Sequence, residues 1–181
     1  MNKEISHLVF DTNIFLKGLE FNLLSGIIYT TPGIIEEIQI KKYDNKNRNI
    51  LNRIEAALVN KKLILKTPLD KYYKFVETKA KKTGDLNALS KADKELIALA
   101  LELIDTKSQE VILFSNDYSI ENVCSELNIP YSPLYKEGIE AKINWEVYCS
   151  FCKKTFKAED LQKNCEICGS KLKRRPKRKE L

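Results

Sequence analysis

The chain has 181 residues, enough for one sizeable domain and a small additional module, and its hydrophobic content of 43% can form a packed core. No apolar run is long enough to span a bilayer, and the sequence opens without the apolar stretch of a secretion signal. These features exclude a membrane-spanning protein, and we expect a cytoplasmic protein without a membrane partner.

The first half of the chain alternates short apolar segments with segments of helical spacing. The predicted strands are residues 6–11, 27–30 and 63–66, and the predicted helices are residues 34–41, 49–61 and 70–82. Thr31-Pro32-Gly33 separates the second strand from the helix after it, and Pro68 ends the third strand. Residues 83–85 are expected to form a loop.

The second half repeats this alternation. Residues 90–104 form the clearest predicted helix, 111–115 a strand, and 118–127 a helix that Pro130 ends. Strands alternating with helices predict an α/β sandwich with a mainly parallel sheet and helices on both faces. His7, in the first strand, and Cys124, on the last helix, are expected to be packed in the core.

Carboxylates lie where these elements meet. Asp11 ends the first strand and Asp117 follows the strand at 111–115, so a parallel sheet places both at one edge. Asp93 begins a helix, and Glu37, with Glu36 beside it, lies in the first turns of another. Each acid also has a simpler interpretation as a helix cap or a solvated residue. Asp11 resists that interpretation because no partner of opposite sign is evident near it.

A carboxylate cluster suits Mg²⁺ or Mn²⁺, which prefer oxygen ligands. Such ions can activate water and stabilise the leaving oxygen of a phosphodiester. His7 is the only histidine, which argues against nucleases that need a histidine pair, and the sequence contains neither a P-loop nor a GxGxxG motif. The acids therefore favour metal-dependent phosphodiester chemistry.

Four cysteines near the C-terminus form two CxxC pairs, with twelve residues between the pairs: Cys149, Cys152, Cys165 and Cys168. This spacing predicts one structural, tetrahedral Zn²⁺ per chain. Two disulfides, or four unrelated cysteines, are the alternatives. Gly169 suits the tight turn after the last ligand. Phe151 and Phe156 are available either to stack on bases or to form the core of the module.

The basic residues concentrate after the cysteines. Residues 171–181 contain seven basic residues and one acidic residue, Glu180: Lys171, Lys173, Arg174, Arg175, Lys177, Arg178 and Lys179. Their net charge of +6 equals that of the whole chain, so residues 1–170 are neutral overall. Such a segment predicts contact with nucleic acid, with a solubilising tail as the alternative. We therefore divide the chain into a nuclease-like domain (1–130), a connector (131–146), a zinc ribbon (147–170) and a basic tail (171–181).

The segments around the acids resemble the PIN-domain nucleases. The matching segments are Val9 to Asn13, Thr31 to Ile38, Leu89 to Ala100 and Phe114 to Tyr118. The resemblance implies an α/β/α sandwich whose acidic, metal-binding cleft cleaves single-stranded RNA. Carried over by residue, it implies that the catalytic residues and Mg²⁺ or Mn²⁺ ligands are Asp11, Glu37, Asp93 and Asp117. It favours Glu37 over Glu36 because the family acid directly precedes an apolar residue, here Ile38.

A PIN domain followed by two CxxC pairs resembles, more narrowly, the archaeal form of the endonuclease that forms the mature 3′ end of small-subunit ribosomal RNA. Thr83-Gly84-Asp85 and residues 118–123 also match that family. The implied partner is precursor small-subunit ribosomal RNA or the pre-small ribosomal subunit. Asn116 departs from the pattern, because that family often has an Asp there, and this weakens one potential metal contact.

Two other functions are considered. A toxin-type PIN ribonuclease is disfavoured by the cysteine pairs, because such toxins are usually shorter and lack a ribbon. A non-catalytic protein that binds RNA or the ribosome is disfavoured by the complete set of four acids. A metal-dependent cleavage assay separates the second of these from the nucleases.

Overall fold

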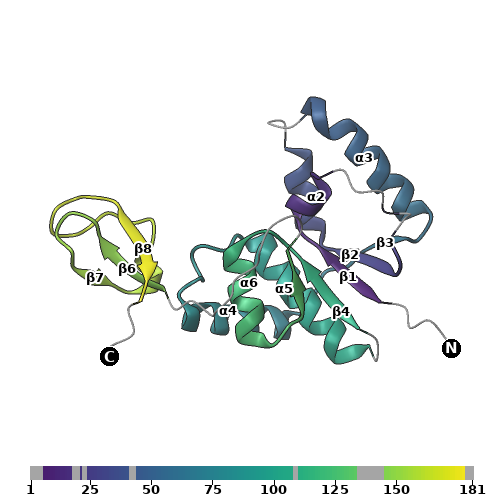
Figure 1. The fold of residues 1–181 in the computed structure, drawn as a ribbon. Helices are drawn as coiled ribbons and strands as arrows, with labels where there is room; N and C mark the ends of the chain where they lie inside the picture. Colours follow the sequence, from purple (N-terminus) through teal and green to yellow (C-terminus); the bar gives the residue numbers. More distant parts are fainter. Residues whose placement is uncertain are drawn as a thin grey trace.

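A computed structural model describes residues 6–17, 21, 24–40, 44–107, 110–133 and 145–177. These residues contain a five-stranded sheet and a three-stranded sheet, and the two lie in different parts of the molecule (Figure 1). We call residues 6–133 the α/β unit and residues 145–177 the ribbon.

The elements of the α/β unit follow one another as strand and helix. Its strands are β1 (His7–Phe10), β2 (Ile27–Thr30), β3 (Leu63–Leu65), β4 (Val111–Phe114) and β5 (Tyr131–Ser132). Its helices are α1 (Thr12–Phe15), α2 (Pro32–Gln39), α3 (Asp44–Val59), α4 (Asp70–Thr83), α5 (Lys91–Thr106) and α6 (Tyr118–Leu127). The predicted elements are all present, and α1 and β5 are additional.

The five-stranded sheet is parallel throughout and has the order β3-β2-β1-β4-β5. All four residues of the central strand β1 are buried, which is typical of a parallel sheet covered on both faces. Helix α5 packs against β1 and β4, and α4 packs against α5 and α6. The expected α/β sandwich with a parallel sheet is confirmed. It places the carboxyl ends of β1 and β4 side by side, in register from His7–Val111 to Phe10–Phe114.

Local signals set the helix ends that matter for the site. The side chains of Asp11 and Asp117 cap α1 and α6. Ser90 and Asp93 form a reciprocal capping box at the start of α5. Gly84 ends α4 with a φ of +83°, in the left-handed region that favours glycine. The capping interpretation of three acids is therefore correct locally, and it leaves their other carboxylate contacts to be explained.

The residues expected in the core are there. His7 is buried with its ring edge-on to Tyr29, at 5.3 Å between the ring centroids. Cys124 is fully buried, and this burial raises the pKa of its thiol. Both residues are therefore part of the packed interior, as the sequence predicted.

The ribbon is an antiparallel sheet of order β7-β6-β8, made by β6 (Trp145–Cys149), β7 (Thr155–Phe156) and β8 (Leu172–Pro176), with the short 3-10 helix η3 (Ala158–Asp160). Strand β8 extends the sheet past residue 170, into the segment expected to be the tail, and β6 begins within the expected connector. Val147 and Leu172 are buried with the cysteines, and Phe156 packs against them. Phe151 is 77% exposed.

None of the helices in the described part of the chain combines the length and the apolar character needed to cross a membrane.

Candidate active site and metal centre

The four acids belong to one hydrogen-bond network at the carboxyl edge of the parallel sheet. Asp11 follows β1 and Asp117 follows β4, and Ser115 joins them. The Ser115 hydroxyl donates to Asp11 Oδ2 over 2.7 Å and accepts from the backbone N–H of Asp117 over 3.0 Å. Because β1 and β4 are neighbours, a hydroxyl one residue beyond β4 can reach both acids.

The other two acids join the network through two further hydroxyls. Thr12 donates to Glu37 Oε2 over 2.6 Å, and the Ser90 hydroxyl lies 3.5 Å from Glu37 Oε1. Ser90 also accepts from the backbone N–H of Asp93, whose carboxylate accepts from the Ser90 N–H. The contacts thus lead from Asp11, through its neighbour Thr12, to Glu37 and on to Asp93.

The network separates Glu37 from Glu36. Glu37 is half-buried and hydrogen-bonded to two hydroxyls, whereas Glu36 is exposed. Both line a cavity of about 600 Å³, together with Ser90. In the described part of the chain, the four cysteines are the one group of three or more potential ligands close enough to hold an ion. The four acids are joined through hydroxyls and do not meet directly.

Burial makes the Asp11 carboxylate costly to ionise. Asp11 is 3% exposed, and its burial raises its pKa to about 7. The hydrogen bonds from Ser115 and Thr12 oppose that rise, and the charges of Asp93 and Asp117 add to it. Asn13 also donates its amide N–H to Asp11 Oδ2. A bound cation would favour the ionised form further, because it would offset the repulsion from Asp93 and Asp117. We call the carboxyl edge of the sheet with Asp11, Glu37, Asp93 and Asp117 the acid edge.

Asp93 has the same character. Burial raises its pKa, against the hydrogen bonds from Ser90, and Asp117 raises it further. No lysine at this edge reaches the acids in the described contacts. Lys94 pairs with Glu77 at 3.0 Å, and Lys91 lies 3.6 Å from Glu95. In the described contacts, these two lysines are therefore paired with carboxylates other than the four acids.

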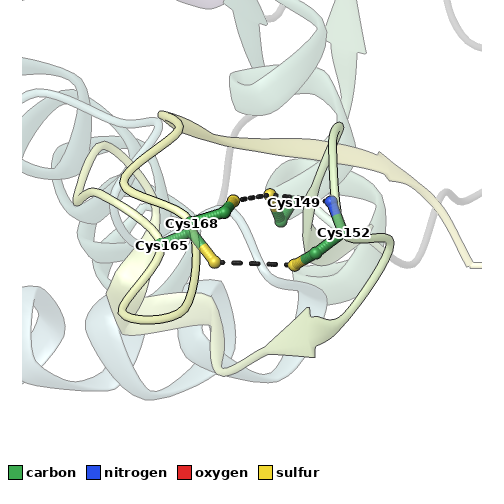
Figure 2. Close-up of side chains that lie close together, drawn as sticks. All are labelled: Cys149, Cys152, Cys165 and Cys168. Carbon is green, nitrogen blue, oxygen red and sulfur yellow. Dashed lines mark hydrogen bonds between the residues drawn. The ribbon is translucent and has the colours of Figure 1, made fainter.

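The cysteines have the geometry of a tetrahedral metal site. All four Sγ atoms lie within 4.8 Å of one another and point inward from the two turns of the ribbon (Figure 2). Cys149 and Cys168 are 3.3 Å apart, and Cys152 and Cys165 are 3.6 Å apart, measured between sulfurs. Four ligands at a Zn–S distance of about 2.3 Å would be about 3.8 Å apart, so the sulfurs fit around such an ion with little movement.

Two local features support this use of the cysteines. Hydrogen bonds from the Ser170 side chain and backbone lower the pKa of Cys168 to about 6, which favours the thiolate that binds metal. Gly169 has a φ of +73°, and its N–H donates to the carbonyl of Cys165 over 2.8 Å. This turn returns Cys168 toward the first pair. All five cysteines, including Cys124, are unpaired by disulfides.

The basic residues divide by their place on β8. Arg174 forms an ion pair with Asp85 of the α/β unit at 2.8 Å. Arg175 pairs with Glu146 at 2.7 Å within the ribbon and lies over the ring of Tyr148. The three lysines of this segment are exposed and make no ion pair with any described residue: Lys171, Lys173 and Lys177. Arg178 and Lys179 lie outside the described residues.

Sequence reasoning did not assign site roles to Ser115, Thr12 or Ser90, nor did it find the Asp85–Arg174 pair. A signal for the hydroxyls was present, because Thr12 directly follows the first acid and Ser115 stands two residues before the last. The ion pair joins residues 89 positions apart, and no local pattern indicates it.

Comparisons with known proteins point to a nuclease family. The family described as PIN domain of ribonuclease matches residues 8–103, a range that contains Asp11, Glu37 and Asp93. The chain is 36% identical to the endoribonuclease Nob1 of Methanocaldococcus jannaschii, over 92% of this chain and 76% of that protein.

Two further relatives are similar over the same range. The endoribonuclease Nob1 of Pyrococcus abyssi is 33% identical over 94% of each chain. The ribonuclease VapC1 of Thermoplasma acidophilum is 34% identical over 92% of this chain and 76% of that protein. The acid edge, the parallel sheet and these matches together place the chain among the PIN-domain ribonucleases, and within them it belongs to the Nob1 endoribonuclease family.

Proposed function

We propose that this ribonuclease cleaves single-stranded RNA at the acid edge with Mg²⁺ or Mn²⁺, and that its substrate is the 3′ end of precursor small-subunit ribosomal RNA in the cytoplasm. The observation that carries the proposal is the buried Asp11. Its carboxylate accepts three hydrogen bonds, yet its pKa is raised to about 7, so the fold holds a costly charge in a fixed orientation. Such a carboxylate at a strand end serves binding better than stability.

The four acids would hold the ion, which when bound supplies an activated water and neutralises charge on the departing oxygen. The protein's own part is orientation. Ser115 fixes Asp11 relative to Asp117, and Thr12 fixes Glu37 relative to Asp11. Attack of water on phosphorus, with departure of the 3′ oxygen, leaves a 5′-phosphate and a 3′-hydroxyl.

In the same proposal, the four cysteines hold one structural Zn²⁺ per chain, which stabilises a ribbon whose hydrophobic core is very small. The ribbon brings the basic residues together for RNA. Lys171, Lys173 and Arg175 lie on or beside β8, and Lys177, Arg178 and Lys179 follow it. Arg174 is excluded from this role because its guanidinium is occupied by the α/β unit.

The test is cleavage of a precursor that spans the 3′ end of small-subunit ribosomal RNA, with Mn²⁺ or with EDTA, followed by mapping of the cut. We expect one metal-dependent cut at the mature end and none with Glu37→Gln. Glu36→Gln is the matched control, since it removes the neighbouring exposed charge, and it should leave the cut in place. Cleavage that is equal with EDTA and with Mn²⁺ would contradict the proposal.

A toxin-type ribonuclease is the second candidate, because the match to VapC1 covers 92% of this chain. The same assay separates the two. A toxin would cut other cellular RNAs as readily as the precursor and would be silenced by a small antitoxin protein. A protein that binds RNA without catalysis would retain the precursor and leave it uncut.

A further inference from the structure

Arg174 crosses from the ribbon to the α/β unit. It lies on β8, and its Nη1 donates to Asp85 Oδ1 over 2.8 Å while its Nη2 donates to the Ser119 hydroxyl over 2.9 Å. Its guanidinium also lies over the Trp145 ring, 4.3 Å from the centroid. Both terminal nitrogens of the planar guanidinium therefore donate hydrogen bonds, in a geometry that a lysine side chain cannot reproduce.

Asp85 is built to receive this cation. Its carboxylate is fully buried, and Asn122 donates to its second oxygen over 2.6 Å. A buried carboxylate without a partner of opposite charge is strongly unfavourable, so Arg174 of the ribbon supplies the positive charge that Asp85 requires. Asp85 lies in the loop after α4, on a different element from the four acids.

The backbones around this pair also fit closely. Gly84 has a φ of +83°, and a side chain there would lie 2.7 Å from the carbonyl oxygen of Trp145. Asn87 donates to the carbonyl of Ala158 over 3.2 Å, and Gln162 donates to the carbonyl of Asn87 over 3.4 Å. The contact therefore includes backbone from the loop after α4, from β6 and from η3.

Arg174 is also linked to the acid edge through Ser119. Ser119, which accepts from Arg174 through its hydroxyl, donates its backbone N–H to Asp117 Oδ1 over 2.6 Å. Ser119 is buried in the first turn of α6, directly after the acid. One residue thus stands between a ribbon side chain and a candidate metal ligand.

Strand alternation explains why Arg174 has this role and Arg175 does not. Successive side chains of a strand point to opposite faces. Leu172 and Arg174 share one face of β8, and Arg175 lies on the other, where it pairs with Glu146 inside the ribbon.

We propose that Arg174 is a positioning residue that fixes the ribbon in one orientation on the α/β unit and steadies Asp117 through Ser119. The consequence for cleavage rests on the proposed function. RNA held by the ribbon would meet the acid edge at a set distance, and this distance would select the phosphodiester that is cut. Loss of zinc, by unfolding β8, would release both effects together.

The experiment uses the full, zinc-loaded chain and three variants. Arg174→Lys keeps a charge beside Asp85 and loses the second hydrogen bond. The double variant Arg174→Gln with Asp85→Asn removes both charges, so no buried ion is left alone. Arg175→Gln removes a positive charge on the opposite face of the same strand. It is the control for the readouts without RNA, because Arg175 is itself proposed to contact RNA.

Two readouts need no RNA and no cleavage. ¹⁵N relaxation should give one rotational correlation time for both parts of the parent chain and of Arg175→Gln, and two different times for the double variant. Calorimetric titration should show that the affinity for Mn²⁺ is about fivefold lower in Arg174→Lys and in the double variant. A fivefold change is the effect expected from the loss of one hydrogen bond. These readouts do not depend on RNA cleavage. A failure of the proposed function can therefore be distinguished from a failure of the role proposed for Arg174.

The proposal fails if the double variant tumbles as one body with unchanged Mn²⁺ affinity. It also fails if RNA affinity falls equally in the double variant and in Arg175→Gln while the double variant tumbles as one body, because Arg174 would then be an ordinary phosphate contact. With an active enzyme, the supporting result is cleavage at several neighbouring positions by the double variant and at one position by the parent chain.

Discussion

Replacing Asp11 with Asn should stabilise the metal-free protein in a way that depends on pH. The pKa of Asp11 is about 7 in the folded protein against 3.8 for an ordinary carboxyl. Between these values the folded state binds the proton and the unfolded state does not, so stability falls as the pH rises. A raised carboxyl pKa therefore gives stability that is complete below about pH 4 and lost as the pH passes about 7.

The magnitude follows from the two pKa values. Asp11 should lower the free energy of unfolding by about 2 kcal/mol at pH 5.5 and by about 4 kcal/mol at pH 8. The Asp11→Asn variant avoids this penalty at both pH values. It loses part of the contact with Thr12, Asn13 and Ser115, at a cost of about 1–3 kcal/mol that does not depend on pH. The difference between variant and parent should therefore grow by about 2 kcal/mol from the lower pH to the higher.

The assay is urea unfolding at about pH 5.5 and about pH 8 without added Mg²⁺ or Mn²⁺, while zinc is retained. Asp70→Asn is the control, because its carboxylate is 77% exposed and its loss should change stability by less than about 1 kcal/mol at either pH. Adding Mn²⁺ should stabilise the parent and leave Asp11→Asn unchanged, since only the parent can bind the ion fully. A difference that is the same at both pH values would refute the reasoning.

Three further predictions concern the ribbon and the acid network. Cys165→Ser should unfold the ribbon and leave the α/β unit folded, which element analysis and NMR spectra would detect as loss of stoichiometric zinc and of the ribbon signals alone. Deleting Lys177 to Leu181 should weaken RNA binding and reduce the slope of its salt dependence by about 2. The deletion begins at Lys177 because a longer deletion from Lys173 would also remove most of strand β8. Ser115→Ala should cost about 1–2 kcal/mol in urea unfolding and move the titration of Asp11 to higher pH, because the Ser115 hydrogen bond lowers the pKa of Asp11; an unchanged titration would contradict the network described for the acids.

The fold of the α/β unit was predictable because its signals are local. Apolar segments of strand length end at Pro, Gly or Asp, and a long helix with an apolar face follows Ser90. The elements that escaped prediction are those whose signals are weak. Helix α1 has four residues and β5 has two. Helix α3 was predicted, but its first residues, from Asp44 to Arg48, lie in a polar stretch that carries no apolar face.

Strand β8 shows a different limit. Its sequence, Leu-Lys-Arg-Arg-Pro, has the composition of a solvated tail, and only pairing with Trp145–Cys149 makes it a strand. The cysteine spacing was local and therefore informative about the site, but the partner of Arg174 was not, because Asp85 lies in another unit of the chain. Sequence patterns indicated which residues are chemically suited to a site, and tertiary contacts decided which of the described arginines pairs with the α/β unit.

In the proposed function, the distribution of charge assigns the ribbon its role. The acid edge contains carboxylates whose pKa values are raised and which no lysine compensates in the described contacts, so it repels a polyanion until a cation is bound. The surplus basic residues follow Ser170 in the sequence, and those that the structure describes lie on or beside β8 of the ribbon (Figure 1). RNA would then be attracted by one part of the chain and cut by another, and the two steps could be coupled only if the parts keep a fixed relation. The buried pair of Arg174 and Asp85 is the contact best suited to that task, since both of its charges are satisfied only when the ribbon is docked.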